Sequence, residues 1–121
     1  MDYHAVRAYC AGKPGTVEDF PFGPDTLVFK VKGKMFALMG AAPQQDGPST
    51  INLKCDPELA EVLRQTFAAV TPGYHMNKRH WNTVVLDGTV PEPDLLDMID
   101  NSYALVVKGL KRADREELGF G

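Results

Sequence analysis

The segment Thr26-Leu-Val-Phe-Lys-Val-Lys-Gly-Lys-Met-Phe-Ala-Leu-Met39 decides the fold. From Thr26 its residues follow a period of two, which is typical of a β-strand with one buried face. The tripeptide Lys32-Gly33-Lys34 predicts a hairpin turn, and residues 35–39 predict the returning strand. The first strand would place Leu27, Phe29 and Val31 on one face and Val28, Lys30 and Lys32 on the other.

Further strands and three helices are predicted on both sides of this hairpin. The strands fall at residues 16–20, 49–55, 74–77 and 81–86, and the helices at 2–11, 56–70 and 93–110. The helix after Asp56-Pro57-Glu58 has the clearest start, because a capping Asp, an N-terminal Pro and an early acid all suit the first turn. Its predicted apolar stripe consists of Leu59, Val62, Leu63, Thr66, Phe67 and Val70.

This order of elements predicts the fold class α+β. Short connections between strands imply an antiparallel sheet, and amphipathic helices would cover one face of it in a two-layer arrangement of order α-β-β-β-(β)-α-β-β-α. A chain of 121 residues is expected to form a single domain over 1–121. Its charged end, residues 111–121, is expected to be a frayed tail.

Composition limits the classes of function. The net charge of −3 argues against a protein built only to neutralise phosphates. Two widely separated cysteines, Cys10 and Cys55, predict reduced thiols rather than a disulfide framework. The N-terminus has no basic start followed by an apolar run, and no stretch is long and apolar enough to span a membrane. We therefore expect a cytoplasmic protein with no membrane partner.

A search for catalytic machinery finds none. Phosphate-binding glycine loops and a nucleophile elbow are absent from the sequence. Cys55 precedes a helix N-terminus, but its position in the strand pairs it with core residues. His75 and His80 do not have a standard ligand spacing, and Glu18 and Asp19 have no predicted carboxylate partner. We expect no catalytic residues, no cofactor and no metal, and hence no enzyme.

Two basic segments remain as candidate binding surfaces. The first consists of Lys30, Lys32 and Lys34 with Lys54, whose amines could bind phosphates from a β-surface. The alternative is a solvated face that keeps the domain soluble and protects a sheet edge. The second is the block Tyr74-His-Met-Asn-Lys-Arg-His-Trp-Asn82, which combines cations, amides and aromatic rings suited to base contacts. The alternative there is a β-turn in which Trp81 anchors the core.

The chain resembles the MmcQ/YjbR family of small bacterial proteins. The resemblance extends from Gly15-Thr-Val-Glu18 and Pro21-Phe-Gly23 to the last predicted helix. It is carried by Phe29-Lys-Val-Lys-Gly-Lys-Met-Phe-Ala37, Asn52-Leu-Lys-Cys-Asp-Pro-Glu58, Pro72-Gly-Tyr-His-Met-Asn-Lys-Arg-His-Trp-Asn-Thr-Val84, Ser102-Tyr103 and Leu105-Val106. It implies a sheet-and-helix fold similar to secretion chaperones and frataxin-like proteins, and the "double wing" DNA-binding label that the family carries.

Three hypotheses follow for function. The first is a non-enzymatic DNA-binding protein, which requires both basic segments to share one face; its candidate residues are Lys30, Lys32, Lys34, Lys54, His75, Asn77, Lys78, Arg79, His80, Trp81 and Asn82. The second is a protein-binding module or homodimer, favoured if Val28, Phe36 and Val84 are exposed. The third is a small anionic-ligand or metal site around His75, Lys78, His80 and Trp81, which needs a concave pocket.

Overall fold

The predicted hairpin is present in the computed structural model, which describes residues 1–73 and 76–120. Strand β2 (Thr26–Val31) pairs antiparallel with β3 (Lys34–Gly40). Lys32 and Gly33 have φ angles of 51° and 79°, so they form a two-residue turn with both residues in the left-handed region. The pairing shifts between Phe29 and Lys30, which leaves Phe36 of β3 as a bulged residue without a partner in β2.

Four more strands extend this hairpin into an antiparallel sheet of six. They are β1 (Thr16–Asp19), β4 (Thr50–Lys54), β5 (Val70–Pro72) and β6 (Trp81–Val85), and the order across the sheet is β1-β2-β3-β4-β6-β5. The α+β class is confirmed. Strand β5 was not predicted, and it forms because the preceding helix ends before Phe67 and Val70 pairs with Val84. Of the strand predicted at 74–77, the described residues Met76 and Asn77 are not in a strand. Tyr74 and His75 lie outside the described residues.

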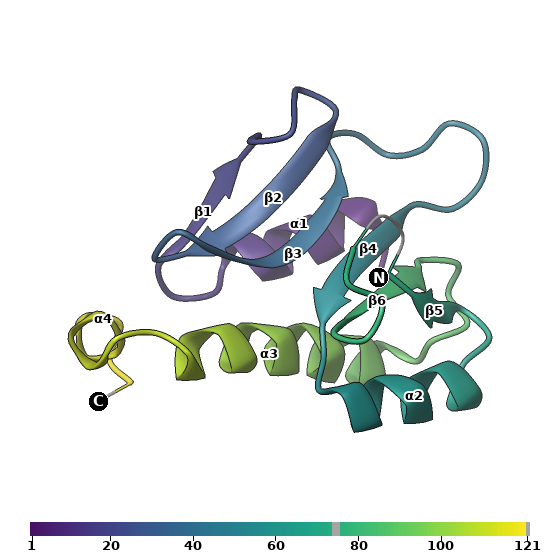
Figure 1. Ribbon diagram of the computed structural model, residues 1–121. Helices are drawn as coiled ribbons and strands as arrows, with labels where there is room; N and C mark the ends of the chain where they lie inside the picture. The colour runs from purple at the N-terminus through teal and green to yellow at the C-terminus, as the bar shows by residue number, and fades with distance from the viewer. Residues whose placement is uncertain (74–75, 121) are drawn as a thin grey trace.

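The core lies between one face of the sheet and the helices (Figure 1). Helix α1 (Tyr3–Ala11) is capped by Asp2, whose carboxylate accepts the Ala5 N–H at 2.8 Å, and α3 (Glu92–Lys108) runs along the sheet. The strand phase is as predicted, since Leu27, Phe29 and Val31 are fully buried. The principal side chains between the layers are those of Val6, Cys10, Leu27, Phe29, Val31, Phe36, Met39, Ile51, Leu53, Val84, Leu95, Ile99, Tyr103 and Val106.

Helix α2 (Pro57–Thr66) forms where expected but buries less of its stripe. Asp56 caps it by accepting the N–H groups of Glu58 and Leu59. Ala60 is its buried residue, whereas Leu59 and Val62 are 38% and 54% exposed. The helix lies near the β5 edge of the sheet rather than over its centre, so only part of the stripe meets apolar partners.

The expectation of a frayed tail is wrong. Residues Arg112–Glu117 form helix α4, which lies beside the β2–β3 turn (Figure 1). Lys32 of that turn forms an ion pair with Glu117. Leu118 packs against the core next to Gly15, and the Phe120 ring lies 6.0 Å from that of Tyr103. These two apolar side chains anchor a segment whose charge alone suggested disorder.

Among residues 1–73 and 76–120, no helix covers the second face of the sheet. On this open face Val28, Leu38 and Trp81 form a separate apolar cluster, with Met35 and Met76 packed against it. Trp81 is only 8% exposed, so the centre of the open face is covered by its own side chains. Within the described residues no helix is long and apolar enough to cross a membrane.

A polar cluster ties α1 to α3 and predicts how stability depends on pH. Tyr9 donates to Asp100 at 2.7 Å, and Lys13 forms an ion pair with the same carboxylate. Burial would raise the pKa of Asp100, but the hydrogen bonds from Lys13 and Tyr9 outweigh it, and the pKa is lowered. A lowered pKa in the folded state gives stability that is present above the unfolded pKa of about 4 and is lost as the pH falls further.

We therefore expect Asp100→Asn to flatten the acid limb of the stability curve. The variant should be less stable than the parent near neutral pH, and the difference should shrink as the pH falls below about 4. Urea unfolding at a series of pH values measures this. Asp97→Asn, at an exposed position one turn earlier on α3, is the matched control. A difference for Asp100→Asn that stays constant across the pH range would contradict the assignment.

Candidate functional site

Strand direction brings parts of both basic segments to one end of the sheet. The last residue of β2, Val31, pairs with Lys34, the first of β3. Strand β4 runs antiparallel to β3 and ends at Lys54, which pairs with Trp81 at the start of β6. The β2–β3 turn and the end of β4 accordingly both lie at the end of the sheet that is nearer to α3 (Figure 1).

At this end Lys34, Lys54 and Trp81 line one hollow of about 350 Å³. Side chains of β3 and α3 complete its wall, and we call it the lysine hollow; its other lining residues are Met35, Leu105, Val106 and Gly109. Lys34 is exposed and Lys54 is half-buried. Among residues 1–73 and 76–120, no carboxylate forms an ion pair with either lysine. Their charge is therefore available to an anion.

The other two lysines of the first segment already have acidic partners. Lys30 Nζ lies 2.9 Å from the carboxylate of Asp19, and Lys32 pairs with Glu117. The hydrogen bond from Lys32 lowers the pKa of Glu117, and the one from Lys30 lowers the pKa of Asp19. A phosphate would have to compete with these carboxylates, so Lys30 and Lys32 are weaker candidates than Lys34 and Lys54.

The loop before β6 is held by hydrogen bonds that the sequence did not reveal. The Asn77 side chain accepts the Arg79 N–H at 3.0 Å, and the Asn77 carbonyl accepts the N–H groups of His80 and Trp81. The carbonyl of His80 accepts the N–H of Cys55 at 2.8 Å. Asn77 and His80 therefore shape the loop, and within its described part, residues 76–80, the exposed side chains are those of Asn77, Lys78 and Arg79.

Arg64 of α2 is the residue that positions this loop. Its Nε donates to Asn82 Oδ1 at 2.7 Å, and its Nη2 donates to the carbonyl of Lys78 and, at 3.4 Å, to that of Trp81. The fork of the guanidinium thus joins α2 to both the loop and β6. A single charged position in an amphipathic helix carries no sequence signal for such a role, so Arg64 was missed.

Three predicted contact residues are in other positions than expected. Asn82 is 2% exposed on the helix-covered face, where Arg64 and Ala60 bind its amide, so it cannot reach a base. Trp81 is a core anchor of the open-face cluster, as the alternative interpretation had it, and shows only part of one wall to the hollow. Arg79 lines a different hollow beside α2, with Glu58 and Glu61. His75 lies outside the described residues.

The features required by the protein-binding and metal-site hypotheses are not found among the described residues. Val28 and Phe36 are 0% exposed and Val84 is 1% exposed, so the apolar patch required for the protein-binding hypothesis does not form there. Among the described residues no group of three His, Cys, Asp or Glu side chains could hold a metal ion. Burial raises the pKa of the Cys10 thiol to about 12 and also raises that of Cys55. Neither thiol has the lowered pKa of a nucleophile.

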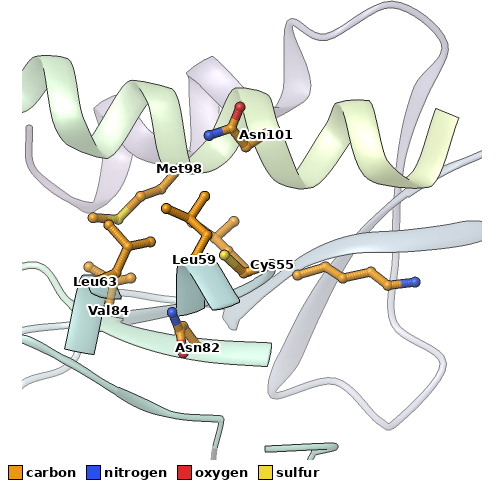
Figure 2. Close-up of a pocket in the computed structure, with 9 residues that line it drawn as sticks. Cys55, Leu59, Leu63, Asn82, Val84, Met98 and Asn101 are labelled. Carbon is orange, nitrogen blue, oxygen red and sulfur yellow. The ribbon is translucent and has the colours of Figure 1, made fainter. Parts of the chain in front are cut away.

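The void between α2 and α3 is not a ligand site. Leu59 and Leu63 from α2 face Met98 from α3 across it, with Cys55 and Asn82 on the sheet side (Figure 2). Its volume is about 10 Å³, room for no more than about one water molecule. The lysine hollow is over thirty times larger and is therefore the better candidate site.

Together these features define a small α+β protein with an open antiparallel sheet, helices on one face and a cationic hollow at one end. The YjbR family model matches residues 11–105, and the chain belongs to this family. The uncharacterized protein YjbR of Escherichia coli K12 is 36% identical over 118 residues, covering 98% of each chain. The uncharacterized protein YbdF of E. coli O157:H7 is 40% identical over 102 residues, covering 84% of this chain and 81% of YbdF.

A solved structure agrees with the fold. The crystal structure of the Deinococcus radiodurans protein DR2400 matches with a TM-score of 0.88 and 45% identity, covering 99% of this chain and 89% of DR2400. The resemblance noted from the sequence is thereby confirmed at the level of family and fold. Because both E. coli relatives are described as uncharacterized, membership assigns no activity.

Proposed function

We propose that the protein is a non-enzymatic nucleic-acid-binding protein that holds phosphates at the lysine hollow. The observation that carries this proposal is the convergence of Lys34 and Lys54, from two strands, in one hollow without an acidic partner among the described residues. Two lysines that line one hollow suit a chain of phosphates, which binds by releasing counterions. Lys78, in the loop next to β6, adds a further cation, and its side chain is exposed.

The overall charge of −3 shapes this interaction. The rest of the molecule repels a polyanion, so binding depends on the local field of a few lysines and weakens steeply with salt. We therefore expect moderate affinity at low ionic strength and little binding at high ionic strength.

Replacing both lysines of the hollow tests the proposal. For Lys34→Ala/Lys54→Ala we expect the log–log salt slope of binding to a single strand to flatten by about 1.4, since each phosphate contact contributes about 0.7 there and about 0.9 on duplex DNA. Fluorescence anisotropy of labelled single- and double-stranded DNA over a range of salt concentrations gives the slopes. Trp81 is the only tryptophan and lines the hollow, so its emission should also change on binding.

Matched controls separate the hollow from net charge. Arg7→Ala/Arg112→Ala removes the same number of charges, from two exposed ion pairs with Glu18 and Glu116, and should leave the slope unchanged. Lys78→Ala/Arg79→Ala should flatten it less than the hollow variant, because Arg79 faces α2. The proposal is wrong if no strand binds at low salt. It is also wrong if Arg7→Ala/Arg112→Ala lowers binding as much as Lys34→Ala/Lys54→Ala does.

A specific observation also keeps the protein-binding hypothesis open as a second candidate. Strand β1 is an edge strand, and Val17 within it and Phe20 beside it are 62% and 45% exposed. An exposed apolar edge can pair with a strand of another chain. Sedimentation of the parent and of Val17→Lys tests this candidate, which requires a dimer that the substitution dissociates.

A further inference from the structure

The open face of the sheet holds a second hollow, at the opposite end from the lysine hollow. It measures about 470 Å³ and we call it the open-face groove; its lining residues are Phe22, Thr26, Leu38, Met39, Gly40, Thr50, Asn52 and Met76. Thr26, Gly40 and Thr50 stand where β2 and β4 begin and β3 ends, far from the β2–β3 turn. The volume is in the range of small-ligand sites, which are mostly apolar with a few placed polar groups.

Phe22 is the unusual feature of this groove. It belongs to the loop between β1 and β2 and is 64% exposed, the largest exposed fraction among the large apolar side chains of the described residues. An aromatic ring kept in water at the rim of a groove offers a flat face for stacking, and every nucleic-acid base has a complementary flat face. Trp81, the aromatic residue expected to serve this purpose, is buried in the apolar cluster instead.

Asn52 supplies a polar group to the lining of the groove. The Thr83 hydroxyl donates a hydrogen bond to Asn52 Oδ1 at 2.5 Å. Among residues 1–73 and 76–120, no acceptor forms a hydrogen bond with Asn52 Nδ2. Its N–H groups can therefore donate to a base edge. Thr26 and Thr50, which also line the groove, carry hydroxyl groups.

The register connects this groove to Lys54. Lys54 follows Asn52 by two residues in β4, so it lies about 7 Å further along the same face, where it lines the lysine hollow. The sugar and phosphate of a nucleotide whose base occupied the groove would extend toward this amine. A duplex keeps its bases stacked inside and could not present one in this way.

We propose that the open-face groove takes an unpaired base of a single-stranded nucleic acid, stacked on Phe22 and hydrogen-bonded by Asn52, while its backbone runs toward the lysine hollow. This inference rests on the proposed nucleic-acid binding and makes it specific: the ligand is single-stranded, and a base as well as the phosphates is bound.

The test compares an intact oligothymidylate with the same strand carrying abasic sites, which keeps the phosphates and removes the bases. Phe22→Ala is expected to weaken binding of the intact strand by about fivefold to 100-fold and to leave binding of the abasic strand unchanged. The salt slope should not change, because no phosphate contact is lost. Phe20→Ala is the matched control, since Phe20 lies in the same loop, is 45% exposed and does not line the groove.

Each outcome has a distinct meaning. Equal loss on both strands, or equal effects of Phe22→Ala and Phe20→Ala, overturns the groove and leaves the salt-dependent phosphate binding intact. Failure of the parent protein to bind any strand at low salt overturns the proposed function, and the groove inference with it. Circular dichroism of both variants should match the parent, because neither ring is part of the core.

Discussion

Replacing Ser102 by alanine is expected to lower the free energy of unfolding by about 2–4 kcal/mol. Ser102 is completely buried on α3, where its hydroxyl accepts the N–H of Lys54 at 2.9 Å and donates to the carbonyl of Phe36 at 2.5 Å. Phe36 is the bulged residue of β3, and the β3–β4 pairing stops at Ala37 and Leu53. The serine thus replaces the next rung of the ladder.

Alanine at position 102 would leave both backbone groups without a partner. A buried donor or acceptor that loses its partner costs about 1–3 kcal/mol, so two such groups account for the expected loss. Urea unfolding of the variant measures it. Asn101→Ala, at the exposed neighbouring position of the same helix, is the matched control and should be nearly neutral. An equally small effect at position 102 would mean that β3 and β4 close the bulge without the hydroxyl.

This substitution also affects the lysine hollow. The Ser102 bond fixes the backbone of Lys54, one of the two lysines that line it. We therefore expect Ser102→Ala to weaken oligonucleotide binding even under conditions where the protein stays folded. The effect should be smaller than that of Lys34→Ala/Lys54→Ala, which removes the charges themselves.

The sequence was sufficient for the parts of the fold that depend on local pattern. Period-two alternation predicted which residues of β2 share a face, and the capping signals predicted that α2 begins at Pro57. It failed where a distant partner decides. The sequence pattern predicted that the apolar stripe of α2 continues through Phe67 and Val70, but Val70 pairs with Val84 in the sheet. Likewise, α4 depends on Leu118 and Phe120 reaching the core from a charged segment.

The candidate site shows the same division. Residue type alone identified Lys34 and Lys54. Antiparallel strand direction places both at the same end of the sheet, although Lys34 pairs with the core-facing Val31 and Lys54 with the open-face Trp81. Alternation also predicts that Asn82 and Trp81 point to opposite faces, yet it cannot say that Arg64 covers one and Met76 the other. The ion pair of Lys32 with Glu117 spans 85 positions, and no local pattern reports a contact at such a separation.

A second large effect is expected from Arg64→Met, which should lower the free energy of unfolding by about 2–3 kcal/mol. Asn82 Oδ1 is buried and would lose its charged donor, and the carbonyl of Lys78 would lose its own. Methionine keeps the apolar stem but supplies no donor. Gln65→Met, at the exposed neighbouring position of α2, is the matched control and should change stability little.

Trp81 reports the loss directly, because it is the only tryptophan and its carbonyl lies within reach of Arg64. In Arg64→Met its emission should shift to the red and become more sensitive to a soluble quencher, since the loop before β6 is no longer held against α2.

Arg64→Lys keeps the charge but lacks the planar fork that serves Asn82 and the Lys78 carbonyl together, so it should restore little. Asn82→Leu removes the acceptor, and a double variant with Arg64→Met should then be less destabilised than the sum of the two. Additive effects would show that Arg64 acts on the loop backbone alone, and the buried amide would need another explanation.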